Sequence, residues 1–224
     1  MSSENTQMNF SRQSRLWNPE EQRTHLAIIG VGSTGSFISL TLAKMGFKDI
    51  DVYDFDKVEE HNIPNQFYRI NDNDKPKVEA LKEIIKDFSN IDINIKNTKI
   101  DKDNEITLKI NSIVVVCVDN MEARKLIYEQ IKEYPIKLLD TRMGGEGFSI
   151  YVVDLANDEE KEKYEKSLDL ETKETSCGEK AIIYTILSIA SETCNIIKMI
   201  DKGEEFPKIL KREMKSYRFL GGLK

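Results

Sequence analysis

Residues 26–68 read LAIIGVGSTGSFISLTLAKMGFKDIDVYDFDKVEEHNIPNQFY, and this stretch decides the fold. It begins with the short apolar run 26–29, whose length and composition are typical of a buried strand. A second short run, residues 50–53, ends at Asp54. Between the two runs, apolar residues recur at helical spacing, and Gly46 suits the end of a helix. These helical residues are Phe37, Leu40, Leu42 and Met45. The stretch therefore predicts a strand, a helix and a second strand.

Three glycines at GxGxxG spacing, Gly30, Gly32 and Gly35, join the first strand to the helix. The first glycine permits a tight turn, the second lets phosphates approach the backbone, and the third lets helix and strand pack closely. The free N–H groups at the start of the helix favour an anion, and Ser33, between the second and third glycines, is a further candidate for binding the nucleotide. Asp54 follows about 20 residues later, where an acid can bind ribose hydroxyls. The glycines could simply form a turn, but this context favours nucleotide binding.

The glycine motif does not distinguish NAD from ATP, whereas the residues after the second strand do. They resemble the DxDxVxxxNxxxQ…PKV stretch of the ThiF/MoeB/HesA family, the adenylating enzymes related to ubiquitin-activating enzymes. The resemblance implies that Asp54 holds ribose and that Asn62 lies near the nucleotide. It implies nucleotide contacts for the other matching positions as well. These are Asp56, Asn65 and Gln66.

Asn65 is a departure from the family pattern. Active members commonly carry an arginine there, which contacts phosphate, and a neutral amide cannot supply its charge. Three outcomes stay open: Arg69 or another cation compensates, the enzyme is slower, or catalysis is lost.

Two basic residues are candidates for binding phosphate. Residues 10–17 (FSRQSRLW) look like the opening of the activating-enzyme family, in which the arginine at the position of Arg12 reaches a phosphate, often across a dimer interface. Guanidinium suits this task because it offers forked donors and keeps its charge. Lys77 matches the family lysine that contacts the phosphates. The simpler alternatives are a surface segment with solvated arginines and a solvated lysine at a helix start.

A β-branched run, residues 113–118 (IVVVCV), is typical of a strand buried on both faces and ends at Asp119 and Asn120. Ligands of open α/β sheets bind at the carboxyl ends of strands. The resemblance to the family's (T/V)DNxxxR element implies that Asp119 helps to hold Mg²⁺ and that Asn120 contacts the nucleotide. Mg²⁺ suits one or two carboxylates plus phosphate oxygens. Alternatively, Asp119 caps the following helix.

Cys177 precedes an apolar helical pattern that begins near residue 182. Free N–H groups at a helix start, together with Lys180, would favour its thiolate. The pattern faintly resembles the crossover cysteine of ubiquitin-activating enzymes, which accepts the activated carboxyl group as a thioester. An ordinary cysteine near a helix start is an equal alternative, because the sequence identifies no general base. Cys117 and Cys194 fall in predicted core elements.

The composition limits the class of protein. The chain has 224 residues, of which 39% are hydrophobic and 32% are charged, and its net charge of −6 argues against general binding of nucleic acid. No membrane span or signal peptide is expected. Three scattered cysteines predict no disulfide framework and favour a cytoplasmic setting. Without CxxC pairs and with only two histidines, a structural zinc site is not expected, although many family members carry one.

The rest of the chain predicts a Rossmann-like, doubly wound α/β sheet that is parallel in its N-terminal half. Further strands are expected at 91–100, 136–140 and 148–153, and the last two are too close together for a helical crossover, which makes them antiparallel. We expect a flexible segment at 1–9, one adenylation domain at 10–200 and a tail at 201–224. The charged residues at about 154–177 lie where the family has its crossover loop.

The resemblance implies Mg-ATP-dependent adenylation of the C-terminal carboxylate of a ubiquitin-like or sulfur-carrier protein ending in glycine. It also implies a homodimer, because the family's counterpart of Arg12 acts across a two-fold axis. Three alternatives remain: a family member that acts on a small molecule or tRNA, a non-catalytic member, and a nicotinamide-dependent oxidoreductase. The last would not explain the residues after Asp54.

Overall fold

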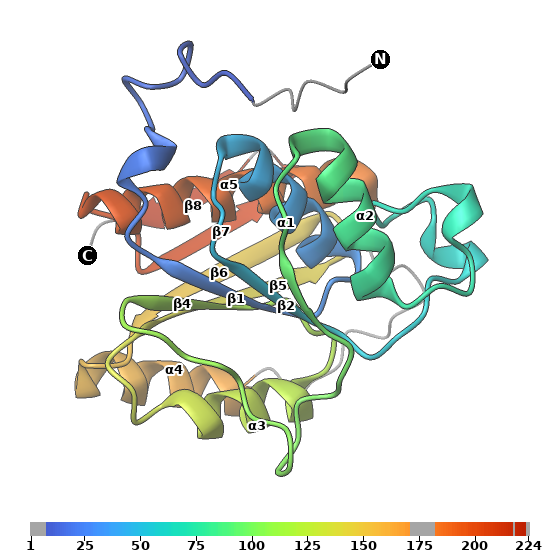
Figure 1. The fold of residues 1–224 in the computed structure, drawn as a ribbon. Helices are drawn as coiled ribbons and strands as arrows, with labels where there is room; N and C mark the ends of the chain where they lie inside the picture. The colour runs from blue at the N-terminus through green and yellow to red at the C-terminus, as the bar shows by residue number, and fades with distance from the viewer. Residues whose placement is uncertain (1–7, 171–181, 217, 223–224) are drawn as a thin grey trace.

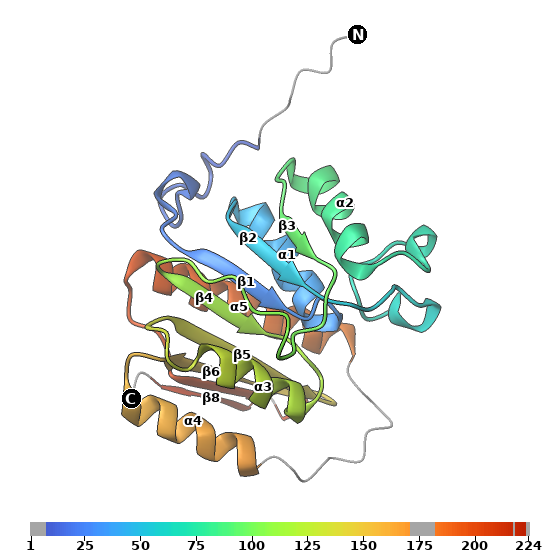
Figure 2. The ribbon, with the colours of Figure 1, turned by 60° about the horizontal axis from the view of Figure 1, so that its bottom comes forward.

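The computed structural model describes residues 8–170, 182–216 and 218–222. In this part of the chain, eight strands form one mixed sheet in the order β3-β2-β1-β4-β5-β6-β7-β8 (Figures 1 and 2). The strands are β1 (His25–Ile29), β2 (Ile50–Tyr53), β3 (Asn94–Lys96), β4 (Ser112–Val116), β5 (Lys137–Gly144), β6 (Gly147–Asp154), β7 (Ile209–Glu213) and β8 (Arg218–Gly222). The predicted α/β fold is confirmed.

The sheet changes character at β5. Strands β3, β2, β1, β4 and β5 are parallel neighbours, whereas β5 to β8 pair antiparallel. Only residues 145–146 separate β5 from β6, and so short a connection can only reverse the chain. Gly145 takes the positive φ, +59°, that this tight turn requires.

Helices cover both faces of the sheet. Figure 1 shows α1 (Ser33–Met45), α2 (Lys77–Ser89) and α5 (Ile183–Lys202) on one face, and α3 (Met121–Ile131) and α4 (Asp158–Leu170) on the other. Successive residues of a strand face opposite sides. Leu26 and Ile28 of β1 therefore pack into the core under α1, while Ala27 and Ile29 pack into the core under α3.

Helix α5 holds the residues directly before β1 and packs along α1. Cys194 lies buried as predicted, with its Sγ 3.7 Å from the carbonyl oxygen of Ile38. At its carboxyl end, Asp201 Oδ1 accepts hydrogen bonds from the N–H groups of Arg23 and Thr24 and from the Thr24 hydroxyl, at 2.6–2.9 Å. The start of β1 is therefore held by the last helix. The helix predicted near residue 182 is thus long, and the start of the tail predicted at 201–224 lies in it.

Length and composition alone would let α5 cross a membrane, and no other helix of the described ranges meets both conditions. Its buried side chains belong to the core that it shares with α1.

Three sequence predictions were wrong in extent. The strand expected at 91–100 contains only residues 94–96, and Ile93 is buried just before it. The strand 113–118 ends at Val116. The tail expected at 201–224 contributes β7 and β8 to the sheet, because Leu210 can reach the core under α5.

The charged segment expected to be a crossover loop at 154–177 is a helix, α4, over residues 158–170. Most of its side chains are exposed, but Tyr164 and Leu168 are buried against the sheet. A stripe of so few apolar residues is hard to see in a charged sequence, yet it is enough to dock one side of a helix.

Candidate nucleotide-binding site

The turn between β1 and α1 has the geometry that its glycines predict. Gly30 adopts a φ of +87°, and a Cβ there would lie 3.0 Å from the Cys117 carbonyl oxygen. A Cβ on Gly35 would lie 1.9 Å from the Gly30 carbonyl oxygen, which no side chain can do. Gly32 is different, because the nearest atom to its Cβ position is Gln66 Nε2 at 3.8 Å. Gly30 and Gly35 are therefore required by packing, whereas Gly32 leaves space beside the helix start.

This difference gives a prediction. Gly32→Ala should leave the melting temperature nearly unchanged but weaken ATP binding by about tenfold or more, since the methyl group occupies the space that a phosphate needs. Gly35→Ala should instead destabilise the fold by about 1–3 kcal/mol, because backbone must move to admit the Cβ. Calorimetric titration with Mg-ATP and thermal unfolding separate the two effects. Equal ATP affinities for the wild type and Gly32→Ala would contradict this interpretation of the turn.

Asp54, at the end of β2, fastens the turn. Its Oδ2 accepts the Val31 N–H and its Oδ1 accepts the Asp56 N–H, both at 2.8 Å. Burial raises the pKa of Asp54 above its ordinary value, although the two backbone donors and the Lys77 charge act in the opposite direction. Each carboxylate oxygen keeps a further lone pair. A ribose contact, as the sequence predicts, is compatible with this second, structural role.

The segment after Pro64 covers the start of α1. The Tyr68 hydroxyl donates to the Val31 carbonyl at 2.6 Å, and the Phe67 N–H donates to Ser36 Oγ at 3.0 Å. Gln66 lies over Gly32, and its Oε1 is buried without a hydrogen-bond partner in the described residues. A buried acceptor of this kind needs a donor. The atom of Gln66 that borders the space beside Gly32 is Nε2, so a hydroxyl or N–H group of a bound molecule, and not a phosphate oxygen, would satisfy Oε1.

Lys77 begins α2 and is only 6% exposed. Its ammonium lies 2.9 Å from Asp56 Oδ2, and its backbone N–H donates to the Asp56 carbonyl at 2.9 Å. The alternative of a solvated lysine is wrong, because this charge is held inside the site. The Asp56 side chain is half exposed, so this pair joins a buried ammonium to a carboxylate that water reaches.

Asp119 and Asn120 follow β4 at the same edge of the sheet, and both are exposed. Asn120 caps α3, since its Oδ1 accepts the Ala123 N–H at 2.8 Å. The capping alternative considered for Asp119 therefore belongs to Asn120. Asp119 stays a candidate for Mg²⁺, and the role predicted for Asn120 in nucleotide binding stays a prediction.

A buried charge network lies beneath Asp119, and sequence reasoning missed it. Asp140, fully buried in β5, pairs with Arg124 and, at 2.7 Å, with Arg142. Arg124 also donates to the Val118 carbonyl, directly before Asp119. Tyr164 of α4 donates to Asp140 Oδ2 at 3.0 Å. Opposite charges two residues apart inside an apolar strand, as in LLDTRM, were the signal that could have found it.

Arg142 extends this network to α4. Its Nη2 lies 3.0 Å from Ser167 Oγ, and its guanidinium lies 4.2 Å from the centre of the Tyr151 ring. The network thus joins the end of β4, β5 and α4 into one rigid support for the edge that carries Asp119.

Arg12 lies away from the turn. Gln13 Nε2 and Trp17 Nε1 donate to the Met45 carbonyl at 2.8 and 3.0 Å, and Trp17 stacks on Phe47. These contacts fix residues 10–17 at the carboxyl end of α1, whose 13 residues span about 20 Å. Arg12 is exposed there. Within one chain, the structure does not bring Arg12 to the glycine turn.

The other residues that the sequence predicted for the site have different surroundings. Asn62 Oδ1 accepts the Glu59 N–H at 3.1 Å, so the side chain serves a local turn. Asn65 N–H donates to the Asn62 carbonyl at 3.0 Å. Cys177 lies outside the described residues. Burial raises the pKa of Cys117 to about 11, which disfavours its thiolate and agrees with a core role.

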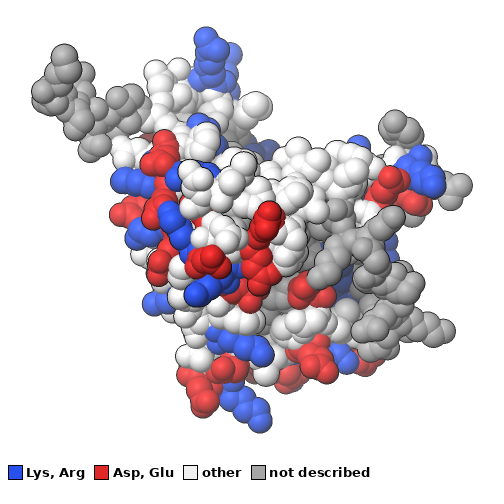
Figure 3. All heavy atoms as spheres, turned by 90° about the vertical axis from the view of Figure 1, so that its right-hand side faces the viewer, with Lys and Arg blue, Asp and Glu red and all other residues white. Residues whose placement is uncertain are grey.

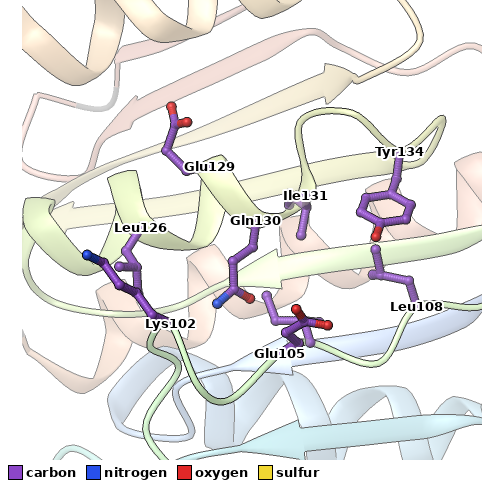
Figure 4. A pocket seen from close by; sticks show the side chains of 9 residues that line it. Lys102, Glu105, Leu108, Leu126, Glu129, Gln130, Ile131 and Tyr134 are labelled. Carbon is purple, nitrogen blue, oxygen red and sulfur yellow. The ribbon is translucent and has the colours of Figure 1, made fainter.

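The surface adds two observations. Figure 3 shows acidic and basic side chains interspersed on the side of the molecule that faces right in Figure 1, beside a broad uncharged area. A separate hollow of about 430 Å³ lies between α3 and the segment that contains Lys102, Glu105 and Leu108 (Figure 4). Its lining shares no residue with the glycine turn.

Comparison with known families decides what kind of protein carries this site. The model of the ThiF family matches residues 9–219. The chain belongs to the ThiF family. The family suggested by the motifs around Asp54 and Asp119 is therefore confirmed.

Curated relatives from the ThiF group match about half of this chain. The NEDD8-activating enzyme E1 catalytic subunit of Arabidopsis thaliana is 36% identical over 105 residues, which are 46% of this chain and 23% of that protein. The ubiquitin-like modifier-activating enzyme 5 of Xenopus laevis is 30% identical over 135 residues, 54% of this chain and 34% of that protein. This chain thus matches only about a quarter to a third of the length of these relatives.

Solved structures show the same ThiF-type fold at lower identity. E. coli MccB, in a structure with ATP, has a TM-score of 0.74 at 14% identity, covering 99% of this chain and 73% of MccB. PaaA has a TM-score of 0.69 at 17% identity, covering 91% of this chain and 74% of PaaA.

Proposed function

We propose that this chain is an adenylyltransferase that uses Mg-ATP to activate the C-terminal carboxylate of a ubiquitin-like or sulfur-carrier protein. The observation that carries the proposal is the arrangement at the carboxyl ends of the parallel strands: space beside Gly32 at the start of α1, bordered by Gln66 Nε2, and the buried ammonium of Lys77. Membership of the ThiF family and similarity to ubiquitin-like activating enzymes support it.

The residues fit ATP in kind. The N–H groups at the start of α1 would bind phosphate oxygens, and Asp54 would hold the ribose. Lys77 would neutralise phosphate charge, and exposed Asp119 would bind Mg²⁺ together with phosphate oxygens. MccB, which shares the fold, has been solved with ATP, and this supports ATP as the nucleotide.

In the adenylation step the chain aligns the carboxylate with ATP and neutralises the phosphate charge. It forms no covalent bond itself in this step. A carboxylate oxygen of the carrier forms a bond to the α-phosphorus, and the bond from that phosphorus to pyrophosphate breaks. Lys77, Arg12 from a second subunit and the cation on Asp119 would balance the charge, and the covered turn would exclude water. Cys177 would then be the candidate to accept the acyl group as a thioester.

Exchange of labelled pyrophosphate into ATP tests the proposal. We expect exchange that depends on a carrier protein ending in glycine and that disappears when the same carrier lacks its terminal glycine. Genes next to that of this chain are the first source of candidate carriers. Exchange with small carboxylic acids alone would instead favour a member acting on a small molecule.

A second candidate function rests on Asn65. The neutral side chain stands where active relatives commonly carry an arginine, and this is the pattern expected of a family member that binds nucleotide without catalysis. Saturable ATP binding without exchange, for every carrier tested, would establish that alternative. Restored exchange in Asn65→Arg would trace the loss to this one position.

A further inference from the structure

A polar cluster lies at the opposite end of β1 and β2 from the glycine turn. His25 begins β1, Asp51 lies in β2, and Asp49 directly precedes β2, where its carbonyl accepts the Leu26 N–H at 3.0 Å. The strand register pairs Leu26 with Ile50 and Ala27 with Asp51. Because alternate residues share a face, His25, Asp49 and Asp51 project on the same side of the sheet. One ligand atom from each lies within 4.8 Å of the others.

The hydrogen bonds around Ser112 define the state of the His25 ring. The Ser112 hydroxyl donates to the Lys109 carbonyl and accepts the Lys109 N–H, each at 2.8 Å. Because its single hydrogen is used, Ser112 Oγ acts as the acceptor for His25 Nδ1, 2.9 Å away. This network assigns the hydrogen to Nδ1. In the neutral ring, Nε2 is then a lone-pair donor, as a metal ligand must be.

Nε2 of His25 is buried and makes no aligned hydrogen bond within the described residues. The residue is 2% exposed. Asp51 Oδ2 lies 3.3 Å away without hydrogen-bond alignment, while Asp51 Oδ1 accepts Asn94 Nδ2 at 2.8 Å. Two electron-rich atoms that face each other out of water are costly unless a proton or a metal ion lies between them, and a metal ion would also engage Asp49.

The separation suits a bound metal. Ligand atoms about 2.0–2.2 Å from a tetrahedral ion lie roughly 3.3–3.6 Å apart. The distance from His25 Nε2 to Asp51 Oδ2 falls at the lower end of this range. Ser112 supplies the outer hydrogen bond that usually fixes a metal-binding histidine.

We propose that His25, Asp49 and Asp51 form a binding site for one divalent transition-metal ion of the Zn²⁺ type. One imidazole and two carboxylates suit Zn²⁺ or Mn²⁺ better than Mg²⁺ or Ca²⁺, which prefer oxygen ligands alone. The site is distinct from the Mg²⁺ position proposed at Asp119. It lies at the amino ends of the parallel strands, whereas Asp119 follows the carboxyl end of β4. Bound there, the ion joins β1 to the start of β2.

Lys109 competes with the metal. Its ammonium lies 2.6 Å from Asp49 Oδ1, and this pairing is the main cause that raises the pKa of Lys109. Asp49 must therefore exchange an ammonium partner for the metal. Removing the ammonium should strengthen metal binding.

The test uses the full chain, stripped with a chelator and titrated with Zn²⁺ alone by calorimetry, with bound metal counted by mass spectrometry. We expect one Zn²⁺ per chain, a higher melting temperature in its presence, and no displacement by excess Mg²⁺. Ser112→Ala should weaken binding about 10–100-fold. Lys109→Gln should tighten it. Substitution of a ligand should abolish saturable binding: His25→Gln, Asp49→Asn and Asp51→Asn.

Two variants serve as matched controls. Asp92→Asn removes an exposed carboxylate paired with Lys82, and Asp119→Asn removes the proposed Mg²⁺ ligand. Both should bind Zn²⁺ like the wild type. Because Asp49 is partly exposed, Asp49→Asn should fold even if the buried variants do not. The proposal is overturned if Zn²⁺ does not bind saturably, if Asp49→Asn binds it unchanged, or if Mg²⁺ displaces it.

Discussion

Asp140→Asn is expected to lower the free energy of unfolding by about 3–5 kcal/mol, because it removes the buried carboxylate that Arg124 and Arg142 share. Both arginines are only 6% exposed, and Asp140 is 0% exposed. Asparagine has nearly the same volume as aspartate. The loss of stability would therefore come from the missing charge and not from a cavity. Equilibrium unfolding in urea measures it.

The control for this variant is Asp92→Asn, which breaks the exposed pair with Lys82 and should cost less than about 1 kcal/mol. A loss of similar size for Asp140→Asn would mean that the arginines find other partners. Asp140→Asn should also weaken binding of Mg-ATP, since Arg124 holds the Val118 carbonyl next to Asp119. If the Mg²⁺ dependence of ATP binding is unchanged in Asp140→Asn, the Asp140 network does not support the proposed Mg²⁺ site at Asp119.

The second large effect is expected for Arg12→Ala, which should reduce pyrophosphate exchange by about 10²–10³-fold, the typical loss for one donor to developing charge. Arg15→Ala is the matched control, because Arg15 is exposed on the same segment. The residues around Arg12 are anchored to Met45, at the far end of α1 from the turn. The proposed mechanism therefore needs Arg12 of a second subunit.

Mixing two inactive variants tests this arrangement. Subunits with Arg12→Ala and subunits with Lys77→Met should regain activity after random exchange, because a mixed dimer contains one site with neither substitution. Such sites make up about a quarter of the total. Failure of the mixture to recover, with exchange of subunits verified, would show that Arg12 does not act in trans.

Much of the geometry of the glycine turn between β1 and α1 could be predicted from sequence, because it depends on residues that are close together in the chain. The positive φ of Gly30 and the contact of Gly35 with the Gly30 carbonyl follow from the spacing of the glycines between strand and helix. The place of Asp54 directly after the second strand follows for the same reason, although its hydrogen bonds to the Val31 and Asp56 N–H groups were not foreseen.

The features that sequence reasoning missed depend on contacts between distant segments. The Asp140 network needs α4 beside β5, and the His25 cluster needs β1 paired with β2 and β4 in one register. The spacing of residues along the sequence does not show which distant segments become neighbours in the fold. The expected absence of a zinc site considered cysteine patterns and the number of histidines, and a site with one histidine and two aspartates from adjacent strands escapes both criteria.

Helix α5 has a consequence for synthesis on the ribosome. The nucleotide turn is encoded early, but α1 packs on α5, and Asp201 of α5 holds Arg23 and Thr24 at the start of β1. A nascent chain that has not yet released residue 201 leaves one side of α1 without its cover, an apolar surface that chaperones recognise. ATP binding should therefore arise only after α5 has been made and has packed on α1, so that products that end before α5 remain inert.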